Sequence, residues 1–420
     1  MKSYAKILSL DFEMYNSMRY WSICWIGAVC SDKSLDEKSR LDIKVNPGTR
    51  HKLIGHELKF PFKYSDLKPL PKFDGCAKSL FDLMDEDTLV VGHAIDNDVK
   101  MLTTACDYYG IECPDFDYLD TNAVRSAIMG EYSQIGLKTL AASYGFEFEA
   151  HNPAEDAAAT LYVLKRMLEE KGIGIDEAES LGIKVGKVRN GLTRRCELNC
   201  MSANARLHND NYNAVFDAVM EACEEGVNRD GAMRGVKMTI DPKLRTSRDL
   251  YSLIKWATLE GARVLGEPRK ADFTLSSELD FSNDRTMSLR MFVDRFGVPE
   301  SVREKLDFFP NKVTDESGEI VSYMQYLKSK SKKPAVRGVR ATYCFAREIE
   351  RRYEFEELAL KLFGMGARIC FMPENRVTFV VDCKERLKDS SDHKVVMFNR
   401  IAPSRKVKLM TLDELKELLR

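Results

Sequence analysis

Two acidic residues, Asp11 and Glu13, stand two positions apart at the end of an apolar segment. Residues 5–13 have the composition of a β-strand, so both carboxylates project from one face and the alternate apolar residues point towards a core. Neighbouring carboxylates repel each other unless a cation neutralises them, and oxygen ligands of this kind suit Mg²⁺ or Mn²⁺. The pair is a candidate metal site, although a solvated strand end is the favoured explanation of such a pair taken alone.

A second acidic position follows an apolar run that ends at a glycine. Residues 88–93 are typical of a buried strand and residues 96–108 carry helical spacing, which places Asp98 in the first turn of a helix. Its carboxylate can favour the helix N-terminus and also reach a site at the strand ends. Helix capping explains Asp96 or Asp98 equally well, so Asp96 is a rival for this role. We interpret His93 as a satisfied polar residue beside the backbone.

The third element begins at His151, which precedes a predicted amphipathic helix extending to residue 171. Pro153 starts this helix, and Asp156 lies in its first turn. A carboxylate fixed on a helix, next to an imidazole on more mobile backbone, suits a metal ligand beside a general base that titrates near neutrality. Taken alone, His151 is equally compatible with an ordinary surface histidine.

Together, in this order, the three elements resemble the DEDDh family of 3′–5′ exonucleases over residues 1–172. The resemblance implies an RNase H-like α/β fold, in which a mixed sheet is flanked by helices. It also implies two divalent ions, Mg²⁺ or Mn²⁺, that clamp the scissile phosphate. One departure is Asn97, because family members often carry an aromatic residue immediately before the catalytic aspartate.

The resemblance assigns a role to each candidate catalytic residue. Asp11 would bridge both ions, and Glu13 and Asp156 would help to hold the ion that activates water. Asp98 would complete the shell of the second ion. His151 would take the proton from the attacking water. The four acids are therefore candidate metal ligands, and all five residues are candidate catalytic residues.

The resemblance also implies that Met14 and Tyr15 flank the terminal nucleotide, with Tyr15 able to stack on a base. The motifs do not discriminate DNA from RNA: we favour DNA, and a 3′–5′ exoribonuclease is the alternative. A second alternative is a nucleic-acid-binding or protein-binding adaptor with a degenerate exonuclease domain. The presence of all five expected catalytic residues argues against the adaptor.

The remainder of the chain is expected to contain a helical linker, 173–232, and two repeats, 233–330 and 335–420. The prediction of a repeat depends on pairs of similar sequence segments. Chance similarity between two α/β segments is the alternative. The correspondences are 234–237 with 337–340, 261–265 with 366–370 and, more loosely, 271–275 with 376–380.

The two repeats resemble BRCT-like domains, small α/β units. The resemblance implies docking to DNA or to a replication or repair protein. Neither copy has the tryptophan usual in the last helix or the Thr-Gly after the first strand, so phosphopeptide recognition is not expected. The lysine-rich segment 328–334 between the copies is interpreted as a solvated linker.

The composition conceals a division of charge along the 420 residues. The formal net charge is −1, from 64 basic and 65 acidic residues. Residues 1–171 carry 20 basic and 27 acidic side chains, whereas the remaining 249 residues carry 44 and 38. No apolar run reaches the ~18 residues of a membrane span. Eleven irregularly spaced cysteines without a signal peptide indicate reduced thiols and a cytoplasmic protein.

Overall fold

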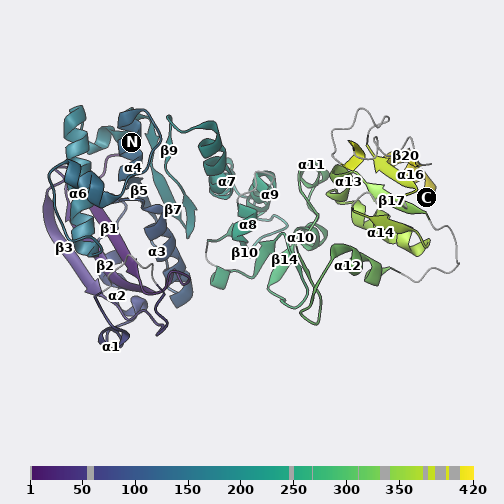
Figure 1. Cartoon of the computed structure of the whole chain (residues 1–420), viewed down its shortest axis with the longest axis horizontal. Coiled ribbons are helices and arrows are strands. Elements are labelled where there is room, and N and C mark those ends of the chain that lie inside the picture. Colours follow the sequence, from purple (N-terminus) through teal and green to yellow (C-terminus); the bar gives the residue numbers. More distant parts are fainter. Residues whose placement is uncertain are drawn as a thin grey trace.

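The computed structural model describes residues 2–53, 61–245, 250–266, 268–310, 312–331, 341–371, 377–383, 394–396 and 407–420. The chain forms three lobes that follow one another from the N-terminus to the C-terminus (Figure 1). All eleven cysteines are free thiols in the structure. Among the described helices, none combines the length and apolar character needed to cross a bilayer.

The first lobe is built on a seven-stranded mixed sheet, which confirms the predicted architecture of this region. Its strand order is β3-β2-β1-β4-β5-β7-β8. The central strands β1, β4 and β5 are parallel, whereas the strands on both sides are antiparallel to their neighbours. The strands are β1 (Lys6–Met14), β2 (Ile23–Ser31), β3 (Glu37–Lys44), β4 (Thr88–Gly92), β5 (Phe116–Asp120), β7 (Gly186–Arg189) and β8 (Leu192–Arg194).

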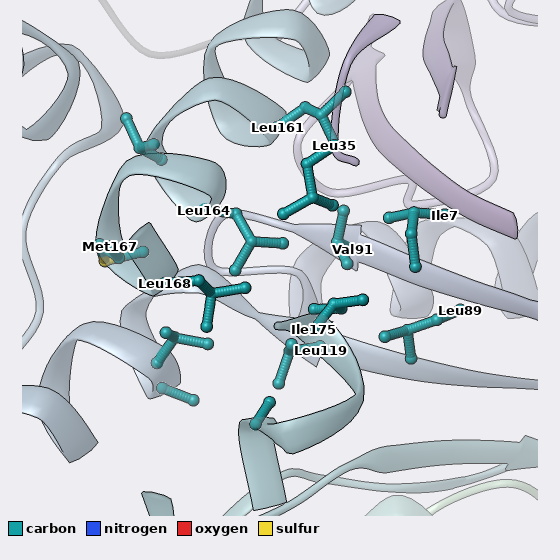
Figure 2. Close-up of a cluster of buried hydrophobic side chains, with 14 of the residues drawn as sticks. Ile7, Leu35, Leu89, Val91, Leu119, Leu161, Leu164, Met167, Leu168 and Ile175 are labelled. Carbon is teal, nitrogen blue, oxygen red and sulfur yellow. The ribbon is translucent and has the colours of Figure 1, made fainter. Parts of the chain in front are cut away.

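Helices cover both faces of this sheet because its strands alternate between two cores. Leu8, Leu10 and Phe12 of β1 face one core, as their alternation predicts, together with α2 and α3. Ile7 faces the other core, where Leu164 of α6 is fully buried near Val91 (Figure 2). Burial of one such leucine contributes about 2 kcal/mol. The helices are α1 (Tyr64–Leu67), α2 (Phe73–Phe81), α3 (Asp96–Tyr109), α4 (Thr121–Met129), α5 (Leu137–Ser143) and α6 (Pro153–Lys171).

The segment predicted as a helical linker, 173–232, differs from that prediction because its first part completes the sheet. Strand β7 pairs with β5, and β8 pairs with β7. These strands have four and three residues, too few for an alternating pattern to be visible in the sequence. Only α7 (Ala203–Glu225) is a long helix, and it packs on the core of the second lobe. The other elements are η1 (Ile175–Leu181), β6 (Ile183–Lys184) and β9 (Glu197–Leu198).

The second and third lobes each contain a four-stranded parallel sheet with the same strand order. The orders are β11-β10-β12-β14 and β18-β17-β19-β20. The strands are β10 (Lys237–Ile240), β11 (Arg263–Val264), β12 (Phe273–Ser276), β14 (Thr286–Ser288), β17 (Thr342–Phe345), β18 (Arg368–Cys370), β19 (Phe379–Asp382) and β20 (Lys408–Thr411).

The repeated Gly-Ala-Arg motif has the same place in both lobes. Gly261 follows α9 (Leu250–Leu259) and Gly366 follows α14 (Phe355–Gly364), each with a positive φ, +93° and +81°. Each glycine adopts the left-handed conformation after a helix, and the arginine then opens an edge strand. The corresponding segment 337–340 and residue 376 lie outside the described residues. The BRCT-like character of the two lobes stays a prediction.

The predicted boundary between the two repeats, near residue 330, falls within a single hydrophobic core to which residues on both sides contribute. The helix α12 (Tyr323–Lys330) lies within the first predicted repeat, yet Leu327 is buried with Phe345 of the second. Of the predicted linker 328–334, residues 332–334 lie outside the described residues. The other elements are α8 (Pro242–Arg245), η2 (Pro268–Lys270), β13 (Leu279–Asp280), α10 (Leu289–Phe296), α11 (Glu300–Arg303), β15 (Val313–Thr314), β16 (Ile320–Val321), α13 (Arg347–Glu350) and α16 (Leu412–Leu418).

A stack of aromatic and cationic side chains joins the first two lobes. The rings of Trp21 and Tyr108 lie parallel, with centroids 3.8 Å apart. Arg19 lies over Trp21 and Arg269 over Tyr108, at 5.6 and 4.7 Å from the ring centroids. Arg269 belongs to the second lobe, and its backbone amide donates to Asp107 at 2.9 Å. The stack thus connects the second lobe to the loop that follows β1.

Candidate active site

The carboxyl end of β1 carries two acids on one face of the sheet. Asp11 pairs in register with Gly27 of β2, and Glu13 pairs with Trp25. Burial raises the pKa of Asp11 well above its usual range, and the charges of Asp98, Asp156 and Glu13 raise it further. Burial, with a contribution from Asp156, raises the pKa of Glu13 to about 7. The acids therefore share one electrostatic environment.

Gly27 allows the start of α6 to approach these acids. A Cβ atom at this position would lie 2.0 Å from the carbonyl carbon of Pro153 and 2.2 Å from the amide nitrogen of Ala154. Only glycine therefore admits the helix this close to the sheet. The side chain of Asn152 caps the helix by accepting the Ala154 amide at 3.2 Å. The close contact fixes the first turn of α6 beside Asp11.

Asp156 lies in that first turn with its carboxylate directed into the site. The residue is 8% exposed, and its Oδ2 atom is buried without a hydrogen-bond partner. Burial raises the pKa of Asp156 to about 7, although the backbone amides of His151 and Asn152 oppose this increase. A buried carboxylate oxygen without a donor is costly, and a cation would satisfy it.

Asp98 reaches the same site from α3. Its Oδ1 accepts the backbone amide of Phe12 at 2.9 Å, and the residue is 5% exposed. Burial raises the pKa of Asp98 to about 8, opposed by that amide. Asp96, the rival position, instead lies against Arg195 at 3.1 Å and Tyr118 at 3.1 Å. The geometry thus favours Asp98 as the member of the acidic cluster.

His151 contacts the cluster from the loop before α6. Its Nδ1 lies 3.4 Å from the Oε1 of Glu13, its side chain is 51% exposed, and its backbone has a φ of +69°. An imidazole at the edge of the cluster, accessible to water, is placed to accept a proton. His93 is bound at both ring nitrogens, to Thr121 at 2.8 Å and to the carbonyl of Ile135 at 2.6 Å. Its interpretation as a satisfied polar residue is confirmed.

The predicted substrate-binding pair differs from expectation. Tyr15 is only 3% exposed and packs in a small cluster with Cys24 and Leu67, its ring 6.2 Å from that of Tyr64. It is therefore not available to stack on a base in this structure. Met14 is partly buried against the core that includes α2 and α3. A register shift of β1 after Glu13 turns the following residues inward, which the sequence pattern does not reveal.

Asp120, at the end of β5, is an acid that sequence reasoning missed. Burial raises its pKa to about 7, and its Oδ1 accepts the amides of Asn122 at 2.8 Å and Ala94 at 3.1 Å. A cavity of about 130 Å³ lies beside it, and Arg195 and Asn209 contribute to the lining. Its position in the sequence could have indicated it. Asp120 ends β5, a strand parallel to β1, and β1 also carries an aspartate near its carboxyl end.

The donor set fits a divalent cation. The charges of Asp98, Asp156 and Glu13 raise the pKa of Asp11, and the charge of Asp156 helps to raise that of Glu13. The buried Oδ2 atom of Asp156 has no hydrogen-bond partner among the described residues. Oxygen donors of this kind bind Mg²⁺ or Mn²⁺. In the part of the chain that the structure describes, no three or more His, Cys, Asp or Glu side chains form a group that could hold a metal ion, so the fit rests on the chemistry of the donors and not on a preformed geometry.

Residues 8–164 match the family model described as Exonuclease (RNase_T). No curated protein matches the chain in sequence. The match supports an exonuclease domain in the first lobe, that is, a nuclease that hydrolyses phosphodiester bonds. It covers the region that contains Asp11, Asp98 and Asp156, and it ends before the strands β7 and β8.

Several solved structures are similar to part of the chain. The nuclease domain of 3′hExo, a DEDDh family member bound to rAMP, is 15% identical over 40% of this chain and 94% of that one, with a TM-score of 0.36. A 3′-exonuclease described in 3′-end-specific recognition of histone mRNA stem-loop is 15% identical over 48% and 94%, with a TM-score of 0.37. Exonuclease I of E. coli with a 5cy-dT13 oligonucleotide is 14% identical over 40% and 42%, with a TM-score of 0.35.

Proposed function

We propose that the protein is a metal-dependent 3′–5′ exonuclease that releases nucleotides from the 3′ ends of DNA. The observation that carries this proposal is the convergence of four acids at the carboxyl end of β1, with His151 against Glu13. This cluster lies within the region that matches the exonuclease family model. RNA is the alternative substrate.

The acids would bind the cations, and the imidazole of His151 would accept the proton of the attacking water. Asp11, Glu13, Asp98 and Asp156 are the proposed ligands, and bound divalent cations would offset the charge of the phosphodiester and favour ionisation of water. His151 accepts the proton of the attacking water at an accessible ring nitrogen. Glu13 lies 3.4 Å from that imidazole, so its carboxylate stabilises the imidazolium that results.

The direct test follows the products of a labelled strand. Single-stranded DNA with a 5′ label and Mg²⁺ should give a ladder that shortens stepwise from the 3′ end, whereas Asp11→Asn should abolish the ladder. The same assay on RNA and duplex DNA decides the substrate. Products shortened from the 5′ end, or an unchanged rate in the Asp11→Asn variant, would overturn the proposal.

The two C-terminal lobes, as BRCT-like units, are proposed to dock DNA or a protein partner of replication or repair. The net positive charge of residues 172–420 supports contact with a polyanion. In the full-length Asp11→Asn variant, forked or nicked DNA should bind more tightly than an unpaired strand of equal length. Equal binding of these DNA forms would leave a protein partner as the role of the lobes.

A further inference from the structure

A basic strip stands out on the first lobe, which is otherwise acidic. Residues 43–53 and 61–72 contain six lysine and arginine residues and one acid, Asp66. All six side chains belong to exposed residues. Residues 1–171 as a whole carry seven more acids than bases, so this strip reverses the local sign. The basic strip consists of Lys44, Arg50, Lys52, Lys63, Lys68 and Lys72.

The strip begins two strands away from the acids, on the same face of the sheet. Glu13 is paired with Trp25, and Trp25 is paired with Lys44. Directly paired residues of antiparallel strands project from the same face, so the three side chains form a row. Neighbouring strands lie about 4.8 Å apart, which places the Cα of Lys44 roughly 10 Å from that of Glu13.

Aromatic rings lie within this row. The ring of Phe62 meets Trp25 edge-on, with centroids 5.0 Å apart. The Nζ atom of Lys44 lies 4.5 Å from the centroid of Phe62 and 5.6 Å from that of Trp25. The cation is therefore held over an aromatic surface at the end of the row that leads from Glu13. Since Trp25 is buried and Phe62 is partly buried, these rings position the Lys44 cation and do not present a face to a base.

The remainder of the strip is attached to the chain that follows the acids. Residues 49–53 run beside residues 15–19, with Leu53 donating its amide to Tyr15 at 3.1 Å and accepting the amide of Ser17 at 2.7 Å. The side chain of Asn46 donates to the carbonyl of Lys68 at 2.9 Å, which joins the two parts of the strip. The first part of the strip therefore lies beside the segment that follows the acids, and Asn46 joins the second part to it.

Two residues of the strip, Arg50 and Lys68, differ from several other basic residues of this lobe that are paired with acids. Lys33, Lys78 and Lys165 are each held by an aspartate. For Arg50 and Lys68, by contrast, the described part of the chain provides no ion pair or side-chain hydrogen bond. Exposed cations that are not neutralised by the protein attract a polyanion, and they lose little by binding it.

We propose that the basic strip binds the sugar-phosphate backbone of a single strand whose 3′ end lies at the acidic cluster. This inference rests on the proposed exonuclease function. Bound divalent cations would act only at the scissile phosphate, so attraction for the rest of the strand has to come from cations outside the acidic cluster. The strip supplies them, and its row of side chains ends at Glu13.

The experiment compares two double variants of the full-length protein with equal loss of charge. Arg50→Gln with Lys68→Gln removes two charges from the strip, and Lys138→Gln with Lys171→Gln removes two exposed charges from α5 and α6. Binding of a fluorescent oligothymidylate of about 12 nucleotides is measured in EDTA, so that no cleavage occurs. The strip variant should bind about tenfold more weakly, and its slope of log K against log salt should fall by about 1.4.

Equal weakening in both double variants, or an unchanged salt slope, would overturn the proposed binding surface. Polyglutamate is the competitor that tests for nonspecific attraction of a polyanion. If it displaced the oligonucleotide from the wild-type protein as well as unlabelled oligothymidylate does, the proposed binding surface would also be overturned. Hydrolysis of the p-nitrophenyl ester of thymidine 5′-monophosphate with Mg²⁺ separates this proposal from the proposed function. This small ester needs only the acidic cluster, so wild type and both double variants should hydrolyse it at the same rate. If the wild-type protein did not hydrolyse the ester, the proposed nuclease function would be contradicted. The binding measurement in EDTA would still show whether the basic strip binds the strand.

Discussion

The backbone amide of Phe12 donates a hydrogen bond of 2.9 Å to the carboxylate of Asp98. Phe12 lies between Asp11 and Glu13, so a single bond fixes an acid of α3 against the two acids of β1. The amide also tolerates a neutral acceptor, because an asparagine oxygen can replace the carboxylate oxygen. Charge and position can therefore be separated experimentally at this residue.

The variant Asp98→Asn should lose at least about 100-fold in nuclease rate, on the scale of losing a charged group that acts in the transition state. Its thermal stability should not decrease, because it retains the bond to Phe12 and removes one of four repelling charges. Asp96→Asn is the matched control and should remain within a few-fold of wild type, since Asp96 faces Arg195. Steady-state kinetics and thermal unfolding provide the comparison, and equal losses in both variants would contradict the assignment.

The metal-free protein should be less stable at pH 8 than at pH 5.5. Burial raises the folded-state pKa of Glu13 and Asp156 to about 7 and that of Asp98 to about 8, above the values near 4 of unfolded carboxyls. Protonation therefore favours the folded state, and this contribution is lost as the pH rises from about 4 through about 8.

Thermal unfolding in EDTA at the two pH values provides the measurement. Mg²⁺ should raise the melting temperature more at pH 8, where the ligands are ionised, than at pH 5.5. An equal effect of Mg²⁺ at both pH values would argue that the ion does not bind the acidic cluster.

Replacement of Gly27 by alanine should displace the start of α6. The added Cβ would lie 2.0 Å from the backbone of Pro153, so the helix has to move, at a cost of about 1–3 kcal/mol in the free energy of unfolding. The nuclease activity should fall even under conditions in which the variant remains folded, because Asp156 moves away from Asp11. Gly136→Ala is the control, since its Cβ meets nothing within 4 Å. Full activity in a folded Gly27→Ala variant would show that this approach does not position the site.

The variant His151→Ala should lower kcat by about 10²- to 10⁴-fold, the usual contribution of a general base. Binding of an oligonucleotide in EDTA should change little, because the imidazole holds a proton rather than the strand. His208→Ala, at an exposed histidine of α7, is the control. A loss of affinity with unchanged kcat would instead assign His151 to substrate binding.

The sequence predicts the elements of the first lobe that carry Asp11, Asp98 and Asp156, because their apolar patterns are recognisable. The expected strand over residues 5–13 corresponds to β1 (Lys6–Met14), and the predicted helix to residue 171 ends at Lys171 as α6. The convergence of Asp11, Asp98 and Asp156 follows from where these elements begin and end. Each acid stands at a strand end or in the first turn of a helix, positions that can be read from the sequence.

The features that the sequence did not reveal depend on contacts between distant segments. Tyr15 follows a register shift, so alternation fails at that point and the ring is buried. Strand β7 is defined by its pairing with β5, not by its own four residues. The basic strip is divided between two segments that meet through Asn46 and Lys68.

The pairing of β7 with β5 also determines where the chain can be shortened. A protein that ended at residue 172 would leave the outer edge of β5 without the partner that Val188 provides opposite Phe116. The exposed amides and carbonyls of an apolar strand act as a template for other chains. Such a truncated nuclease should self-associate through β5, whereas a protein that extends beyond Arg194 retains β7 and β8 as a protecting border.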